Sequence, residues 1–282
     1  MDRLVRSLAV MTLAVVTLAA ALLVPAARAQ GVLLRVHPRV GDTLHTRLEQ
    51  QTEINASLPG LSGRTTKSVT TSVRLDARTI VQMSSPASTL VLTIVDSAAL
   101  STSDVHGAAQ VAAAERTLRG QQLVLQLGAD GTVESARDAR GMPVPRDVAD
   151  AMSAMPAVFP RRVVTVGEQW TRELPIPAGG PLGARGAGRV NAVFRLDSLD
   201  RSGNLAFVSL RGEILPDAEA QGVQLSGAVT GAMQVDRQRG WMTDSRFTVI
   251  VRSLVTPPPS SGLAPMRFVT RVTQRLRTMD KR

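Results

Sequence analysis

The chain has 282 residues and a formal net charge of +10 at pH 7, with 33 Lys and Arg residues against 23 Asp and Glu residues. Cysteine is absent, which excludes disulfides, thiol catalysis and a lipid anchor on an N-terminal cysteine. Aromatic residues make up 2% of the chain, which disfavours nucleic-acid binding because bases stack on aromatic side chains.

The first thirty residues predict a secretory signal peptide over residues 1–29. Arg3 and Arg6 precede an apolar run from Leu8 to Val24, and Ala27-Arg28-Ala29 places small residues at both recognition positions of a cleavage site. An uncleaved membrane anchor is the alternative, but it would need about 18 or more apolar residues, and this run is slightly shorter. We therefore expect a soluble periplasmic or secreted bacterial protein with no transmembrane segment after cleavage.

Apolar and polar residues alternate with a period of two through most of the remaining chain. In residues 189–197, Val190, Ala192 and Phe194 fall on one face and Arg195 falls on the other, which is typical of a half-buried strand. The same pattern predicts strands at 32–36, 43–54, 66–75, 90–95, 121–127, 189–197, 205–214, 223–235, 247–255 and 267–278.

Turns that contain glycine separate several of these strands. Asp130-Gly131, Ser202-Gly203-Asn204 and Arg239-Gly240 indicate hairpins, because glycine tolerates a positive φ. The connections are short enough to favour antiparallel neighbours. Two longer segments rich in proline or glycine, residues 175–188 and 256–265, predict loops.

Two segments predict helices. Residues 145–155 begin with proline, which the first helical turn tolerates, and place apolar residues at helical spacing before Pro156 ends the pattern. Residues 108–118 are rich in alanine and lie between Gly107 and Gly120. The second helix would have only a thin apolar face.

The second half of the chain restates features of the first in the same order. Val40-Gly41-Asp42 precedes the opening strand of one half, and Val166-Gly167-Glu168 precedes that of the other. Asp42 and Glu168 occupy equivalent positions, where an acidic residue commonly stabilises a turn. We interpret the pattern as an internal duplication. Chance similarity between two antiparallel sheets is the alternative.

These patterns predict a mostly β protein with curved antiparallel sheets in two similar halves, open or half-barrel-like, and one or two short helices. The first β-rich half would span residues 30–144, and the second would span residues 161–282. Residues 145–160 would form a helix and connector between them. Whether the halves form one sheet or two domains is left open by the sequence.

No catalytic, metal-binding or cofactor-binding motif emerges. Gly60-Leu61-Ser62-Gly63 is one residue short of the Gly-x-Ser-x-Gly nucleophile elbow. His37 and His45 flank a turn that holds Asp42, but transition-metal sites usually need three or four converging ligands. We therefore predict no catalytic residue, no metal and no cofactor, and we regard a hydrolase as the least favoured function.

Arginines gather on one face of the last predicted strand, opposite Phe268, Val272 and Leu276. Two further arginines, in other predicted strands, share this solvated face. Exposed arginines support solubility and protect sheet edges without any ligand, but guanidinium groups also suit phosphate and carboxylate. The candidate anionic-ligand face consists of Arg195, Arg252, Arg267, Arg271, Arg275 and Arg277.

One segment resembles a known family. Pro160 is followed by Val163-Val164-Thr165-Val166-Gly167-Glu168-Gln169-Trp170 and then by Leu174-Pro175-Ile176-Pro177. This Val-Gly-acid-x-Trp segment is similar to one in a family of exported bacterial β-rich proteins that carry only a domain-of-unknown-function label. The resemblance implies export and β structure, and it supplies no catalytic residues to carry over.

These observations favour a non-catalytic binding or interaction module of the cell envelope. A curved sheet with aliphatic strands suits a lipid or another apolar ligand better than a sugar, because sugars generally stack on aromatic rings. The alternative is a structural scaffold or assembly protein whose partner is another envelope protein. The oligomeric state is left open by the sequence.

Overall fold

The computed structural model describes residues 31–60, 63–144, 158–175, 188–216, 223–257, 260 and 264–279, all within the unit Gly31–Arg282. The expected signal peptide at 1–29 and the expected helix at 145–155 lie outside the described residues. Both therefore stay predictions.

The described secondary structure consists of strands, one helix and one short 3₁₀ turn. The strands are β1 (Thr43–Gly60), β2 (Gly63–Ser84), β3 (Ser88–Thr102), β4 (Gln122–Gly128), β5 (Val133–Asp138), β6 (Gln169–Pro175), β7 (Gly188–Leu199), β8 (Leu205–Pro216), β9 (Val223–Asp236), β10 (Trp241–Val255) and β11 (Met266–Met279). The 3₁₀ turn η1 (Val105–Gly107) leads into the helix α2 (Ala108–Leu118), which lies between β3 and β4 in the chain.

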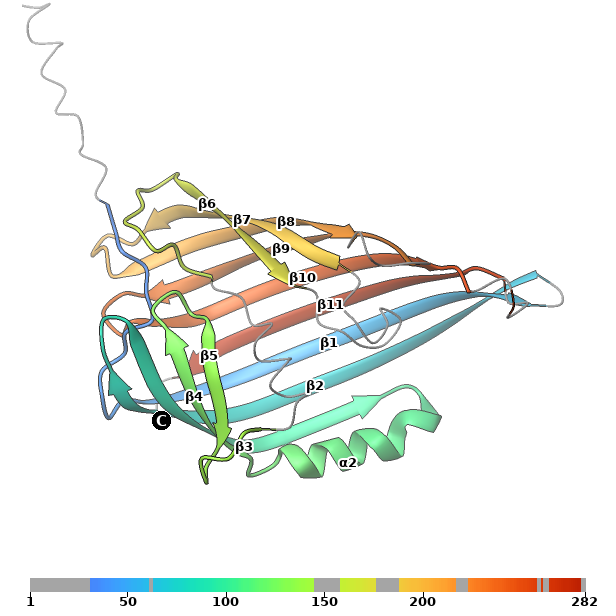
Figure 1. Ribbon diagram of the computed structural model, residues 1–282, viewed down its shortest axis with the longest axis horizontal. Helices are drawn as coiled ribbons and strands as arrows, with labels where there is room; N and C mark the ends of the chain where they lie inside the picture. The colour runs from blue at the N-terminus through green and yellow to red at the C-terminus, as the bar shows by residue number, and fades with distance from the viewer. Residues whose placement is uncertain are drawn as a thin grey trace, which may run out of the picture. The chain divides into compact units, whose positions relative to one another are not determined.

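All of these strands form one antiparallel sheet, in the order β5-β4-β3-β2-β1-β11-β10-β9-β8-β7-β6 (Figure 1). Chain neighbours pair within two meanders, β1 to β5 and β6 to β11. Strands β1 and β11 join the meanders at the centre, in a register that runs from His45 opposite Met279 to Ser57 opposite Arg267. The sheet is open, since β5 and β6 are its edges. The predicted β-rich, antiparallel fold is confirmed, and both meanders belong to one continuous sheet.

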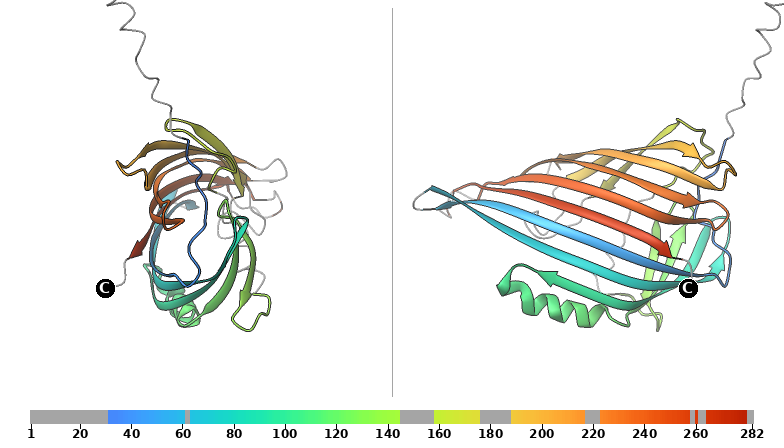
Figure 2. Two further views of the ribbon diagram at one scale, coloured as in Figure 1. Left: turned by 90° about the vertical axis from the view of Figure 1, so that its left-hand side faces the viewer. Right: turned by 180° about the vertical axis from the view of Figure 1, so that it is seen from behind.

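The sheet is curved in the direction across its strands, so one of its faces is concave (Figure 2). We call this face the inner face. On β7 to β9 it carries the small residues Ala192, Gly212, Gly227 and Gly231. A side chain on Gly231 would collide with the ring of Phe247 on the neighbouring strand. Glycine and alanine therefore relieve the crowding that curvature imposes on a concave face.

The buried core also lies on the inner face. Its most enclosed side chains, each at most 2% exposed, come from the sheet and from the segments that cross one end of it. They include Val32, Leu34, Val81, Val91, Phe159, Val164, Phe194, Leu196, Val208 and Val235. Since these residues come from both meanders, a single core stabilises the whole sheet.

Residues 32–36 keep the predicted alternation but do not form a strand of the sheet, so that prediction was wrong. The N–H of Val32 donates to the carbonyl of Val164 at 2.8 Å, and the N–H of Val36 donates to that of Ala129 at 2.8 Å. These partners lie in two different connections, so no continuous ladder forms. The segment is extended and crosses the end of the sheet, with its even-numbered side chains buried.

The predicted glycine turns are present. Gly131 has φ +90°, Gly203 has φ +71° and Gly240 has φ +60°, and they lie in the β4–β5, β7–β8 and β9–β10 connections. These values fall in the left-handed region that favours glycine. The three predicted hairpins are confirmed.

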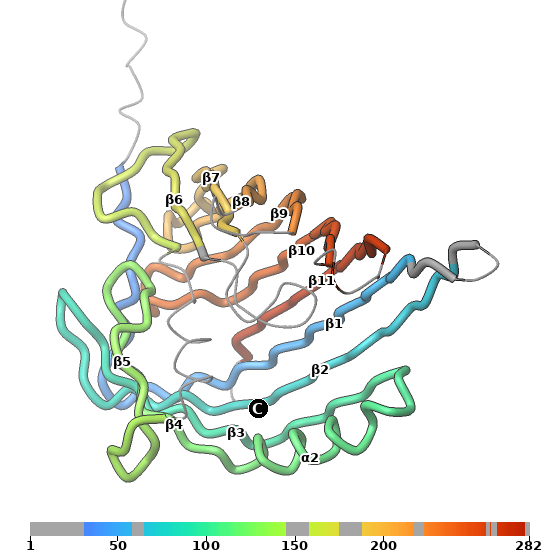
Figure 3. The backbone as a smooth tube through the Cα atoms, turned by 45° about the vertical axis from the view of Figure 1, so that its right-hand side comes forward, coloured from blue at the N-terminus to red at the C-terminus, as the bar shows by residue number. Residues whose placement is uncertain are grey.

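Helix α2 forms over the predicted residues 108–118 and lies beside β3 (Figure 3). Strand β4 pairs with β3 only as far as Ile94, and α2 covers the edge beyond it. The carboxylate of Glu115 accepts the N–H of Leu100 at 3.1 Å, and Nε of Arg119 donates to the carbonyl of Ala98 at 3.2 Å. The helix thereby satisfies backbone groups that would otherwise form an open edge.

Candidate functional site

The inner face of the four central strands β2, β1, β11 and β10 is the candidate binding surface. Cross-strand pairing aligns its side chains in rows, one of which contains Leu75, Leu48 and Leu276. Leu44, Val81 and Val251 on these strands are buried, whereas other apolar side chains of the same face are partly exposed. We call ten of the partly exposed side chains the inner trough; its members are Leu48, Ile54, Val69, Val73, Leu75, Phe247, Val249, Phe268, Val272 and Leu276.

The burial of the inner face differs between its regions. Leu44, Val81 and Val235 are buried where the N-terminal segment crosses the sheet, and Ile214 and Val229 are buried on β8 and β9. The inner trough instead keeps part of its apolar surface accessible. It is therefore the part of the inner face that can still bury apolar area against a ligand.

Polar side chains lie between the apolar ones in the trough. Gln50, Thr52, Thr270 and Gln274 share the inner face of β1 and β11. Nε2 of Gln50 donates to Oγ1 of Thr52 at 3.4 Å. These groups give the surface hydrogen-bonding sites beside its apolar side chains, which is typical of sites that orient a partly polar ligand.

The six arginines of the candidate anionic-ligand face all project from the outer face of the sheet. Arg267, Arg271, Arg275 and Arg277 occupy alternate positions of β11, and Arg252 lies opposite Val269 on β10. Arg195 lies on β7, and β8, β9 and β10 separate it from β11. The structure brings five of these residues onto adjacent strands and leaves Arg195 apart.

Carboxylates accompany several of these arginines. Asp244 lies 3.1 Å from Arg275 and 3.8 Å from Arg277, and Asp197 lies 3.9 Å from Arg195. Such pairs give the outer face a mixed charge, which is typical of a solvated surface. Binding of an anion to this face stays a prediction.

The Val-Gly-acid-x-Trp segment has structural partners. The ring of Trp170 stacks on that of Phe194, with centroids 5.6 Å apart and planes 8° apart. Its Nε1–H donates to the carbonyl of Val158 at 2.9 Å, and the side chain is buried. Trp170 therefore anchors β6 to the core.

The two turns that we matched between the halves make the same hydrogen bonds. Gly41 has φ +87° and Gly167 has φ +89°. Each glycine donates its N–H to the second strand of the hairpin that follows, at 2.9 and 2.7 Å respectively. Asp42 and Glu168 each accept the N–H of the residue three positions earlier, at 3.2 and 2.8 Å. Both acids therefore stabilise turns, as expected, while the duplication itself stays a prediction.

Four carboxyl groups in the described residues have a shifted pKa, and all four shifts are downward: Asp76, Asp130, Glu168 and Asp200. Burial of Asp76 opposes its ionisation, but hydrogen bonds from Arg47 and Ser97 outweigh burial and hold its pKa below the ordinary value. These groups are ionised at neutral pH and occupied by structural contacts. A general acid would need a raised pKa instead.

Two further features of the described residues bear on the candidate functions. They contain no group of three or more His, Asp or Glu side chains placed to hold a metal ion. No helix among them is long and apolar enough to cross a membrane.

Sequence reasoning missed a basic pocket at the end of the sheet, which has a volume of about 580 Å³. Arg35, His37 and Arg39 line one wall, and Arg237 and Gly240 belong to the opposite wall. The alternation of residues 32–36 places the odd-numbered side chains away from the core. However, only the folded chain brings them beside the β9–β10 turn.

No family model matches the sequence, and no curated protein matches it. Solved structures found to be similar to this chain include DynF of the dynemicin biosynthesis pathway of Micromonospora chersina. DynF is 9% identical to this chain, the match covers 90% of this chain and 88% of DynF, and the TM-score is 0.21. An outer membrane lipoprotein-sorting protein domain from Vibrio parahaemolyticus is 9% identical, with 82% and 83% covered and a TM-score of 0.20. A DUF1329 family protein from Desulfovibrio piger is 10% identical, with 82% and 85% covered and a TM-score of 0.19.

TM-scores near 0.2 carry no argument about function. The family resemblance of the Val-Gly-acid-x-Trp segment stays unconfirmed.

Proposed function

We propose that this protein is a non-catalytic binding module of the bacterial cell envelope, and that its inner trough holds a lipophilic ligand such as an acyl chain. The observation that carries the proposal is the partial exposure of the trough on β2, β1, β11 and β10, beside an inner face that is otherwise packed. Export through a signal peptide at residues 1–29 is part of the same proposal.

The chemistry of the trough favours an aliphatic ligand. Eight of its ten members are Leu, Ile or Val, and the other two are Phe247 and Phe268. Each methylene removed from water contributes about 0.8 kcal/mol, whereas association costs about 4 kcal/mol or more in lost freedom. A Kd of about 1 μM corresponds to about 8 kcal/mol, so a ligand must bury on the order of fifteen methylenes to reach it, which requires contact with several trough rows. Gln50 and Gln274 would lie beside the polar part of such a molecule.

The first test is the ligand itself. Protein purified from the envelope of its own host and analysed by native mass spectrometry should carry a bound lipid or other lipophile. Protein that is free of any such molecule, and that also fails to bind a fluorescent fatty acid, would refute the proposal.

The second test compares two variants of β11 that make the same chemical change on opposite faces. Val272 lies in the trough, and Val269 lies on the outer face with 39% of its surface exposed. We expect Val272→Gln to weaken binding of a fluorescent fatty acid about tenfold, since an amide would replace apolar contact area. Val269→Gln should bind as the unaltered protein does. Equal effects of the two substitutions would place the ligand elsewhere.

A further inference from the structure

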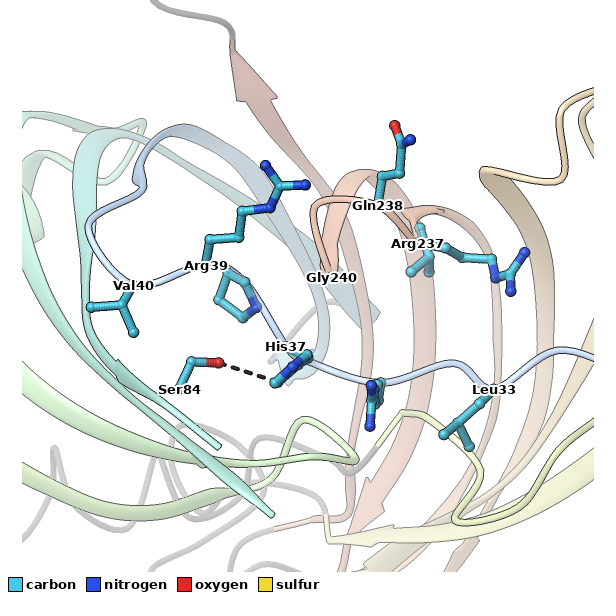
Figure 4. Close-up of a pocket in the computed structure, with 11 residues that line it drawn as sticks. Leu33, His37, Arg39, Val40, Ser84, Arg237, Gln238 and Gly240 are labelled. Carbon is cyan, nitrogen blue, oxygen red and sulfur yellow. Dashed lines mark hydrogen bonds between the residues drawn. The ribbon is translucent and has the colours of Figure 1, made fainter. Parts of the chain in front are cut away.

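The basic pocket at the end of the sheet carries an inference beyond the proposed function. The extended N-terminal segment separates it from the core. The even-numbered residues Val32, Leu34 and Val36 of this segment are buried, whereas Leu33, Arg35, His37 and Arg39 line the pocket. Pro38, Val40, Val235, Ser84 at the end of β2, and residues 237, 238 and 240 of the β9–β10 turn complete the lining (Figure 4).

The pocket has no acidic residue to balance its charge. Arg35, Arg39 and Arg237 belong to its lining, and the described lining residues include neither Asp nor Glu. The nearest acids in the chain are already occupied. Asp42 accepts the backbone N–H of Arg39 at 3.2 Å, and Asp236 accepts those of residues 238 and 239 at 3.0 and 2.9 Å.

The arginine side chains remain available to a ligand. Among the described residues, the guanidinium groups of Arg35 and Arg39 have no hydrogen-bond or ion-pair partner. Arg237 donates through Nη1 to the carbonyl of Gly203, and its other N–H groups remain available. Three cations that share a pocket repel one another, so a bound anion relieves a cost that the empty pocket carries.

The walls of the pocket are held together by specific contacts. The N–H of His37 donates to the carbonyl of Gly240 at 2.9 Å, and Nδ1 of His37 lies 3.2 Å from Oγ of Ser84. Gly240 has φ +60°, and a Cβ at this position would collide with the His37 carbonyl. Both walls are therefore fixed before a ligand arrives.

We propose that this pocket binds an oxyanion of the phosphate type. Guanidinium groups present paired N–H donors that match phosphate oxygens. A volume of about 580 Å³ holds a phosphate together with part of a molecule that carries it. Leu33 and Val40, which are 41% and 63% exposed, add apolar surface for the carbon atoms of such a molecule. The source of the phosphate is either the free ion or the headgroup of an envelope lipid.

Two arms of one experiment distinguish the sources. In the first arm, inorganic phosphate is titrated into the protein and the heat is measured. In the second arm, the protein is sedimented with phosphatidylcholine vesicles that either contain or lack phosphatidic acid. Binding in either arm supports the site, and binding only to phosphatidic acid vesicles assigns it to a lipid headgroup. The absence of binding in both arms overturns the proposal.

Matched variants locate the site. Arg35→Gln and Arg39→Gln should each raise the Kd about tenfold, since each removes a charge-assisted contact. Arg211→Gln removes the same charge from the outer face of β8, at an exposed residue outside the candidate anionic-ligand face, and should leave the Kd unchanged. An equal loss in Arg211→Gln would show that binding depends on net charge, and it would refute the pocket. Because Arg39 is exposed, has no side-chain partner among the described residues and adds to the repulsion within the pocket, its replacement should not lower the melting temperature.

The trough variant separates the two proposals. Val272→Gln should leave phosphate binding intact, because the trough and the pocket share no lining residue. Weakened fatty-acid binding with unchanged phosphate binding in this variant supports both proposals. If the unaltered protein binds the fatty acid but not phosphate, or the reverse, one proposal is refuted and the other stands.

Discussion

Replacing Trp170 by Phe tests whether the Val-Gly-acid-x-Trp segment serves the fold. The substitution keeps a ring that can stack on Phe194 but removes the Nε1–H that donates to Val158 at 2.9 Å. A carbonyl in this part-buried position that loses its donor costs about 1–3 kcal/mol. The smaller ring leaves a cavity that costs about 1 kcal/mol more. We therefore expect Trp170→Phe to lower the free energy of unfolding by about 2–4 kcal/mol.

The chain contains two tryptophans, so Trp241→Phe is a matched control. Trp241 is only half-buried beside the core, and its replacement should cost about 1 kcal/mol or less. Urea unfolding followed by far-UV circular dichroism measures both values. The reasoning fails if the two variants differ by less than about 0.5 kcal/mol, a typical effect of surface substitutions. Phosphate binding should be the same in both variants.

Three further substitutions test particular contacts. Burial opposes the ionisation of Asp130, but hydrogen bonds from Thr132 and Arg161 outweigh it and hold the pKa below its ordinary value. The folded pKa lies below the unfolded one, so the contribution of Asp130 to stability is present above about pH 4 and is lost as pH falls through the folded pKa. Asp130→Asn should therefore weaken the protein at neutral pH and reduce its acid sensitivity in urea unfolding; an unchanged pH dependence would contradict this. Gly240→Ala should cost about 2 kcal/mol or more in thermal unfolding, because φ is positive and the Cβ meets the His37 carbonyl. Gly41→Ala, with φ +87° and open space around the Cβ, should cost only about 1 kcal/mol; equal costs would rule out the collision. Glu115→Ala removes the acceptor for the Leu100 N–H at the edge of β3 and should increase aggregation measured by light scattering, whereas Glu115→Gln keeps an acceptor oxygen and should not.

Local patterns predicted much of the secondary structure. Alternation over residues 189–197 predicted most of β7, and the glycines at 131, 203 and 240 marked three hairpins. The alanine-rich stretch at 108–118 predicted α2. Each of these features depends on neighbouring residues alone: a side-chain period, a positive φ or a helix propensity.

Local patterns failed where partners mattered. Residues 32–36 alternate as a strand does, yet their backbone bonds go to Val164 and Ala129, so they cross the sheet end instead. Strand β1 extends to Gly60, beyond the predicted end at residue 54, because its pairing with β2 continues to the hairpin at Gly63. The pattern within a segment does not contain this information.

The candidate sites divide in the same way. Alternation correctly placed Arg267, Arg271, Arg275 and Arg277 on one face of β11, but only the tertiary structure supplied Asp244 as the partner of two of them. The basic pocket joins Arg35 to Arg237, which lie far apart in the chain.

The sequence by itself determined that most of this chain forms antiparallel strands with one apolar face, since a side-chain period of two needs no distant partner. Only the tertiary structure decided that β1 pairs with β11, that one sheet curls around a single core, and that the inner trough stays partly exposed. Those outcomes depend on hydrogen bonds and contacts between residues that are distant in the chain. The entropy cost of closing the long loops between such residues is offset only when the whole sheet forms.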